Sequence, residues 1–169
     1  MKITLVADVY SAQNNGTSIT ARRLVDSMKA RGHEVTVVSD YDGNDDGIKY
    51  VVLDKRKFPV LNEYIEKSNG VTFAEPDREK LTEAIKNSDV VHFLLPFKLS
   101  KAGLPIAREL KVPYTSAFHC QPENITSHVG MMHRDFPNRL IYKKFLNKFY
   151  KDVQFIHCPS EFIASQLKA

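Results

Sequence analysis

The fold is decided by the stretch Asn14-Asn15-Gly16-Thr17 and by what lies on either side of it. An apolar run at residues 3–7 precedes it. A segment of helical length, with apolar residues at helical spacing, follows it, and a second apolar run occupies residues 35–38. Strand, glycine-containing turn, helix and strand form the first unit of a parallel α/β sheet.

The turn of such a unit lies at the carboxyl edge of the sheet, which is where ligands bind. A glycine at residue 16 lets a ligand approach the backbone, and the following helix offers unpaired N–H groups to an anion. We therefore expect Asn15, Gly16 and Thr17 to form a binding loop.

The remainder of the chain alternates in the same way. We expect strands at residues 48–53, 89–94, 112–117 and 153–156, and helices at 77–87 with Asp77 as its cap, at 99–110, at 136–151 and from 159 onward. Residues 54–76 read as an irregular excursion with at most a short helix, and residues 119–130 read as a loop. Strands separated by helices predict a Rossmann-like α/β fold, a parallel sheet with helices on both faces.

Length and composition place the chain among globular proteins. Its 169 residues, 43% of them hydrophobic, suggest one domain. No apolar run approaches the ~20 residues of a membrane span, and Met1 leads into a strand without a signal-peptide pattern. We expect a cytoplasmic protein in which Cys120 and Cys158 are reduced. The net charge of +4 is modest, and no nucleic-acid-binding motif is recognised.

The end of the chain suggests a longer protein. Ser160 is a good cap for a final helix, but the pattern stops at Ala169 without a glycine or asparagine to end it. We expect that a longer chain was trimmed here; the alternative is a natural terminal helix that frays.

Five segments in order resemble one family. They are Asn15-Gly16-Thr17 and residues 30–37, 88–92, 112–119 and 158–164. Together they resemble the N-terminal domain of a GT-B fold glycosyltransferase of the family 4 type. Such enzymes usually have two glycines in the first loop, whereas here Asn15 takes the first position.

The resemblance implies that residues 1–169 are a single acceptor-side domain and that a C-terminal domain binding the nucleotide sugar is absent. It implies a retaining enzyme of the cell envelope that transfers a hexose from a nucleotide-diphosphate sugar to a lipid or saccharide acceptor. It implies no cofactor and no required metal, because a helix N-terminus at Gly16 and Thr17 can meet the diphosphate. The fragment alone is expected to be inactive.

A different class remains open. The chain can also be read as a non-catalytic Rossmann-like module that binds a nucleotide or a sugar phosphate. The missing Gly-x-Gly-x-x-Gly pattern disfavours a dinucleotide dehydrogenase. The downstream reading frame would separate the transferase from the module.

His119 is the candidate catalytic residue. It follows the strand at 112–117 and so lies at the same edge as Gly16. By resemblance it matches the family's active-site histidine, which contacts the transferred sugar; without the resemblance it would be read as a histidine that bonds loop backbone groups. In the same loop Gln121, Glu123 and Asn124 are expected to bind substrate.

Three other histidines are weaker candidates. His92 lies inside an apolar strand and is expected to be structural. His128 and His133 belong to the loop after His119, and the sequence does not decide whether they touch the acceptor. The acidic run at residues 40–47 fails the EF-hand pattern and reads as a solvated loop, so no metal site is expected.

The segment 139–151 carries five basic residues and no acid, with Ile141, Phe145 and Phe149 four residues apart. Such a helix can lie on an anionic membrane surface as a peripheral contact at the inner face. The alternative is that the apolar stripe packs on the sheet and the basic residues face water.

Overall fold

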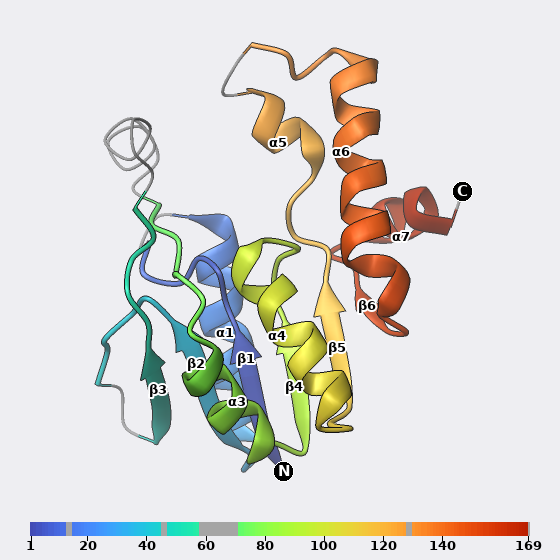
Figure 1. The fold of residues 1–169 in the computed structure, drawn as a ribbon. Helices are drawn as coiled ribbons and strands as arrows, with labels where there is room; N and C mark the ends of the chain where they lie inside the picture. Colours follow the sequence, from blue (N-terminus) through green and yellow to red (C-terminus); the bar gives the residue numbers. More distant parts are fainter. Residues whose placement is uncertain (13–14, 45–46, 58–70, 128–129, 169) are drawn as a thin grey trace.

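The computed structural model describes residues 1–12, 15–44, 47–57, 71–127 and 130–168. Strands and helices alternate along them as predicted (Figure 1). The elements are β1 (Lys2–Val6), α1 (Gly16–Ala30), β2 (Glu34–Ser39), β3 (Ile48–Val52), α3 (Arg78–Lys86), β4 (Val90–Phe93), α4 (Lys98–Glu109), β5 (Tyr114–Ala117), α5 (Pro122–Thr126), α6 (Asp135–Lys148), the 3₁₀ helix η2 (Tyr150–Asp152), β6 (Ile156–His157) and α7 (Glu161–Lys168). None of the described helices is long and apolar enough to cross a bilayer.

The six strands form one parallel sheet in the order β3-β2-β1-β4-β5-β6. The chain starts in the middle of the sheet at β1, moves outward to β3, returns to β4 beside β1 and moves outward again to β6. This order confirms the Rossmann-like fold. It also places the point where the strand order reverses, at which ligands bind in such sheets, between β1 and β4.

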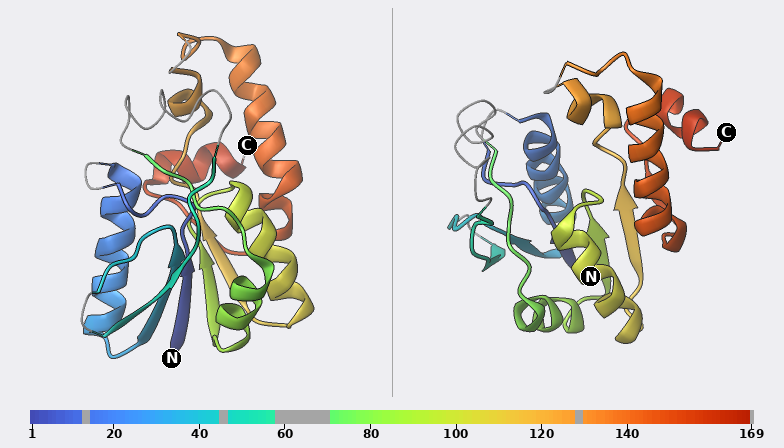
Figure 2. Two further views of the ribbon diagram at one scale, coloured as in Figure 1. Left: turned by 60° about the vertical axis from the view of Figure 1, so that its left-hand side comes forward. Right: turned by 45° about the horizontal axis from the view of Figure 1, so that its top comes forward.

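Helices cover both faces of the sheet (Figure 2). On one face α1 contributes Ala21 and Val25 to a buried cluster with Leu5 and Val37. On the other face α3, α4 and α6 contribute buried apolar residues to a second cluster, which includes Phe93 of β4. Because the middle strands are covered on both sides, they read in the sequence as continuous apolar runs.

Two helices begin directly after the residues predicted to cap them. Asp77 caps α3 by accepting a hydrogen bond from the N–H of Lys80 at 3.0 Å, and Leu81 in that helix is fully buried, as predicted. Ser160 caps α7 by accepting from the N–H of Ile163 at 3.3 Å. These short polar side chains satisfy N–H groups that the first turn of a helix leaves free.

Three predicted boundaries were wrong. The loop at 119–130 contains the helix α5, which begins with Pro122, a residue suited to a first helical position. The predicted helix 136–151 ends at Lys148, because Phe149 leaves helical geometry with φ −150° and ψ −66° and is fully buried. The predicted strand 153–156 is displaced, since the pairing with β5 involves Ile156 and His157.

The apolar stripe of the basic helix packs on the sheet. Phe145 and Phe149 are buried in the cluster around Phe93, and Ile141 packs against it. Leu146, beside that stripe in sequence, is instead 54% exposed. In the predicted excursion at 54–76, Lys55 pairs with Ala74 in an antiparallel bridge. Residues 58–70, where most of that excursion falls, lie outside the described residues.

Candidate functional site

The candidate site lies at the carboxyl edge of the sheet, around the loops that follow β1, β4 and β5 (Figure 1). These three strands are neighbours, with Leu5 opposite His92 and His92 opposite Thr115. The loops leaving them therefore meet at one edge even though they lie far apart in the sequence. This edge adjoins the reversal point between β1 and β4.

The β1–α1 loop places Asn15 as the cap of α1. Its side-chain Oδ1 accepts hydrogen bonds from the N–H groups of Thr17 at 2.9 Å and Ser18 at 3.4 Å. The Thr17 N–H therefore already has a partner in the loop, because an asparagine in this position caps the helix, and the binding of substrate by Thr17 stays a prediction. Asn14 lies outside the described residues.

Gly16 is the residue of this helix N-terminus that remains accessible. It is exposed, its N–H is not one of those bonded to Asn15, and a Cβ built on it would meet nothing within 4 Å. The space that a side chain at Gly16 would occupy is thus open among the described residues, at the end of α1 where the helix dipole is positive.

Arg22 adds a fixed positive charge next to this loop, and sequence reasoning missed it. Its guanidinium lies 4.6 Å from the ring centroid of Tyr10 and 4.5 Å from that of Tyr41. Its Nη2 donates to the carbonyl of Tyr10 at 3.0 Å. The two tyrosines follow β1 and β2, so two neighbouring strand ends hold one cation in place.

Asp8, also missed, ties the end of β1 to the start of α4. It is 1% exposed. Its carboxylate accepts from the N–H of Leu99 at 2.8 Å and from the N–H and hydroxyl of Ser100 at 3.3 and 2.7 Å. Burial raises the pKa of Asp8 to about 6, against the lowering effect of these hydrogen bonds. The N-terminus of α4 is thereby occupied by the protein's own carboxylate.

His119 stands two residues beyond the end of β5, as predicted. Its Nε2 is buried and has no hydrogen-bond partner among the described residues. Burial, and next the nearby His157, lower the pKa of His119, so the ring is neutral at pH 7. The alternative role, a histidine that bonds loop backbone groups, is not served by this nitrogen.

His157 lies beside His119, with ring centroids 5.5 Å apart and the planes at 69°. It is the last residue of β6 and pairs with Ala117 at the end of β5. His92 on β4 completes a group of three imidazoles with His119, which follows β5, and His157 on β6. Its Nδ1 bonds the Thr115 hydroxyl at 2.8 Å, and burial lowers its pKa to about 4. The bond to Thr115 supports the structural role expected of His92, while its Nε2, like that of His119, is buried without a partner among the described residues.

The other predicted substrate-binding residues lie on or next to α5. Gln121 and Glu123 both interact with the hydroxyl of Tyr142 on α6, and the carboxylate of Glu123 raises the pKa of that hydroxyl after the larger effect of burial. Glu123 Oε2 is buried without a partner in the described structure. Asn124 is part of α5.

The remaining polar residues add little at this edge. His133 is exposed between α5 and α6, and His128 lies outside the described residues. Both cysteines are free, and burial raises the pKa of the Cys120 thiol to about 12. Among the described residues no three His, Cys, Asp or Glu side chains are grouped as metal ligands.

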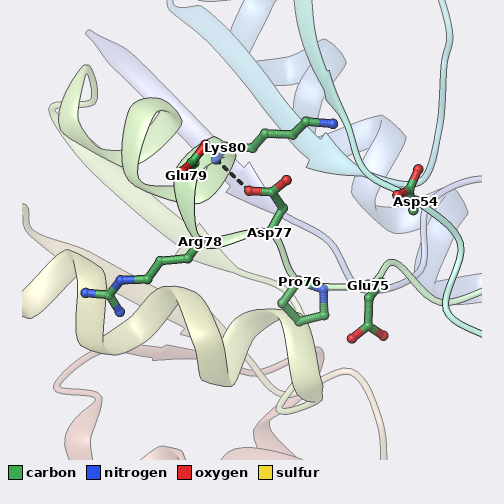
Figure 3. Close-up of a pocket in the computed structure, with 7 residues that line it drawn as sticks. All are labelled: Asp54, Glu75, Pro76, Asp77, Arg78, Glu79 and Lys80. Carbon is green, nitrogen blue, oxygen red and sulfur yellow. Dashed lines mark hydrogen bonds between the residues drawn. The ribbon is translucent and has the colours of Figure 1, made fainter.

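A hollow of about 370 Å³ lies elsewhere, where α3 begins (Figure 3). It contains none of the predicted site residues and is lined by Asp54, Glu75, Pro76, Asp77, Arg78, Glu79 and Lys80. Asp77 already caps the helix, and Lys80 donates to the carbonyl of Val52 at 2.9 Å. Asp77 and Lys80 therefore serve local structure here.

A doubly wound α/β domain with a glycine-led helix and a neutral histidine at its carboxyl edge belongs to the class of Rossmann-like ligand-binding domains. Residues 14–169 match Glycosyltransferase Family 4. The chain belongs to this family.

Two relatives show how similar the chain is to other proteins in sequence and how much of their length it covers. The chain is 29% identical over 171 residues to the alpha-monoglucosyldiacylglycerol synthase of Streptococcus pneumoniae, covering 99% of this chain and 37% of that protein. It is 26% identical over 141 residues to the GDP-mannose-dependent alpha-mannosyltransferase of Mycolicibacterium smegmatis, covering 78% of this chain and 36% of that protein. The chain thus spans little more than a third of these relatives.

One solved structure has a similar fold, and at its low sequence identity the similarity concerns the fold alone. The short-chain dehydrogenase/reductase of Veillonella parvula in complex with NADP has a TM-score of 0.54, with 8% identity, over 92% of this chain and 67% of that chain.

Proposed function

We propose that the chain is the acceptor-side domain of a retaining glycosyltransferase that moves a hexose from a nucleotide-diphosphate sugar to a lipid or saccharide acceptor. Membership of Glycosyltransferase Family 4 supports the reaction class. The relatives' names support a hexose and a nucleotide donor, and the one that spans nearly the whole chain is named for a lipid product. The nucleotide would be held by the part of such enzymes that the chain does not span.

The observation that carries the proposal is the buried, unpartnered Nε2 of His119 at the carboxyl edge. A buried polar atom without a partner costs about 1–3 kcal/mol. The nitrogen is closed to solvent in this structure, so a sugar hydroxyl would reach it, and recover that cost, once the neighbouring side chains move apart. A neutral imidazole can donate a hydrogen bond to the hydroxyl and orient its dipole toward an oxocarbenium-like centre.

The β1–α1 loop supplies the second function, contact with the diphosphate. The Gly16 N–H points from the positive end of α1, and the Arg22 cation is held next to the same loop. Both favour negative charge that develops on a leaving phosphate. Gln121 and Glu123 would hydrogen-bond hydroxyls of the acceptor or the sugar, together with Asn124.

The test is a comparison of His119→Ala and His119→Gln in the full-length enzyme. A positioned group that acts in the transition state is worth on the order of 2–4 kcal/mol, so kcat should fall about 30- to 1000-fold. The melting temperature should change little. His33→Ala, a histidine just before β2 at the opposite edge, serves as the matched control. A normal kcat for the His119 variants, or loss of folding together with activity, would make His119 structural.

A further inference from the structure

A cluster of polar side chains lies at the carboxyl edge near β1 and β2, apart from His119. Ser11 belongs to the loop after β1, Asp40 directly follows β2, and Thr72 lies in the segment before α3. Thr72 donates its hydroxyl to Asp40 Oδ2, and Ser11 donates to the same oxygen at 3.1 Å. The two hydroxyl oxygens are 2.7 Å apart. We call these three residues the Asp40 cluster.

Asp40 has one carboxylate oxygen without a partner. Although the sequence predicted a solvated loop here, Asp40 is 6% exposed. Both hydroxyls bond Oδ2, whereas Oδ1 is buried and bonds no group among the described residues. No ion pair in the described part of the chain includes Asp40. Because buried carboxylate oxygens are normally hydrogen-bonded, the cluster lacks one donor.

The charges around the Asp40 cluster favour a neutral donor. Tyr41, which follows Asp40, and Tyr10, which precedes Ser11, hold the Arg22 cation over their rings. The carboxylate disfavours a phosphate at Oδ1, and the neighbouring guanidinium disfavours a second cation. A hydroxyl carries no charge and donates one hydrogen bond, which is what Oδ1 lacks. A sugar ring offers several such hydroxyls next to one another, so the cluster is suited to a sugar.

We propose that the Asp40 cluster binds a hydroxyl of a hexose ring in the acceptor, so that a glycosylated lipid or a saccharide is the preferred acceptor, an assignment that rests on the proposed function. The strand order places β1 and β4 between β2, which Asp40 follows, and β5, which His119 follows. Three strand spacings amount to roughly 14 Å. One hexose held at His119 does not cover that distance. The ring at Asp40 is therefore a second sugar.

The surroundings of Oδ1 determine how the sugar binds. Ser11 and Thr72 are half-buried, and Oδ1 itself is closed to solvent, so a sugar hydroxyl reaches it once the neighbouring side chains move apart. The segment that carries Thr72 is tied to the loop after β1, since the N–H of Ala74 donates to the carbonyl of Asp8 at 3.2 Å. Binding should therefore change the surroundings of Ser11, Asp40 and Thr72 together.

Asp40→Asn separates sugar binding from a structural role. The amide keeps one oxygen that accepts from Ser11 and Thr72, and it places an NH₂ donor where Oδ1 stood. In the full-length enzyme, with monoglucosyldiacylglycerol in mixed micelles as acceptor, the KM for the acceptor should rise about tenfold or more. The kcat and the KM for the nucleotide sugar should stay unchanged. Asp42→Asn is the matched control, because Asp42 is exposed two residues along the chain, and it should alter none of these constants.

The acceptor itself supplies a second control. Diacylglycerol has no sugar ring and would be the poorer acceptor for the natural enzyme. With diacylglycerol, Asp40→Asn should change no kinetic constant, because the Asp40 cluster then has no ring to bind. Direct binding is measured by titrating methyl α-D-glucopyranoside into the 169-residue chain and following its amide signals by NMR. The signals of Ser11, Asp40 and Thr72 should shift with the glucoside and stay in place with magnesium chloride or inorganic phosphate.

The proposal is overturned if Asp40→Asn leaves the KM for the glucosylated acceptor unchanged, if it raises the KM for the nucleotide sugar instead, or if glucosylated and plain diacylglycerol are affected alike. Should the variant fail to fold, the titration of the natural chain decides: no shift at the Asp40 cluster with the glucoside, or a shift with magnesium or phosphate, overturns the proposal. The titration needs no sugar donor. A full-length enzyme that transfers no sugar, beside a chain that binds the glucoside at this cluster, would therefore count against the proposed function alone.

Discussion

At the scale of single residues, the histidine group at the carboxyl edge sets the charge of the candidate site. His119 is kept neutral first by burial and second by the neighbouring His157. His157→Ala removes the second cause and opens space, so the pKa of His119 should rise. Titration of the ring signals by NMR measures this directly, with His33→Ala as the control. An unchanged or lower pKa of His119 would mean that the ring contact at 5.5 Å has no electrostatic effect.

Asp8 and His92 should affect stability in opposite directions as the pH changes. The pKa of Asp8 is raised from 3.8 to about 6, so its folded form binds the proton more tightly and stability falls as the pH rises through this window. The pKa of His92 is lowered from 6.5 to about 4, so stability rises with pH between those values. Each shift corresponds to about 3 kcal/mol.

The two effects largely cancel in the natural chain, and single substitutions should uncover them. Relative to the natural chain, Asp8→Asn should gain stability as the pH rises from 4 to 6, because only the His92 effect remains. His92→Gln should lose stability over the same range. Urea unfolding at a series of pH values gives both curves. Parallel curves for the natural chain and either variant would show that the substituted group keeps its ordinary pKa in the folded state.

At the scale of elements, the packing of α4 on β4 depends on a glycine. A Cβ on Gly103 would lie 2.8 Å from Cε1 of Phe93. Phe93 is fully buried, and its ring packs edge-on against those of Tyr114 and Phe149. The ring therefore has no easy way to move aside.

Gly103→Ala should destabilise the fold by about 1–3 kcal/mol, although alanine favours a helix by ~1 kcal/mol. Gly16→Ala is the matched control, because a Cβ there meets nothing within 4 Å; its stability should change by less than ~0.5 kcal/mol. Equilibrium urea unfolding measures both. If the two variants proved equally stable, Phe93 would have to be freer than its packing indicates.

The sheet could be predicted because each strand is an apolar run between helices of clear periodicity. Helix α5 could not, since the five residues of Pro122–Thr126 are too few to show a period. The end of α6 was missed for the opposite reason. Phe149 continues the four-residue spacing of Phe145, but in the structure Phe149 leaves helical geometry and is buried, and the Tyr150 hydroxyl donates to the carbonyl of Ala117.

Some residues of the candidate site could likewise be predicted from the sequence, and others could not. His119 was found because it follows a clear strand. His157 was missed because the predicted strand ended one residue before it. Arg22 could not be found from the sequence, because its contacts with Tyr10 and Tyr41 depend on β1 and β2 being neighbours in the sheet. Capping of α1 by Asn15 uses a residue that also looked available to a ligand.

At the scale of the whole molecule, the carboxyl edge carries every group that we assign to substrate, and under the proposed function it would form one wall of the site. Gly16 and Arg22 favour an anion, and His119 offers a hydrogen bond. Relatives such as the Streptococcus pneumoniae enzyme are much longer, and this chain spans 37% of that protein. The second wall, with the donor nucleotide, would come from the length that the chain does not span.

The 169-residue chain should therefore fold without transferring sugar. Its six-stranded sheet has a buried core on both faces, so a cooperative unfolding transition is expected. Catalysis requires donor and acceptor to be held in one geometry, which contributes about 7–11 kcal/mol that a single wall cannot supply. The measurement is product formation from UDP-glucose or GDP-mannose with diacylglycerol vesicles, alongside circular dichroism to establish folding. Multiple turnovers by the folded chain would place the whole active site within these residues and remove the need for a second wall.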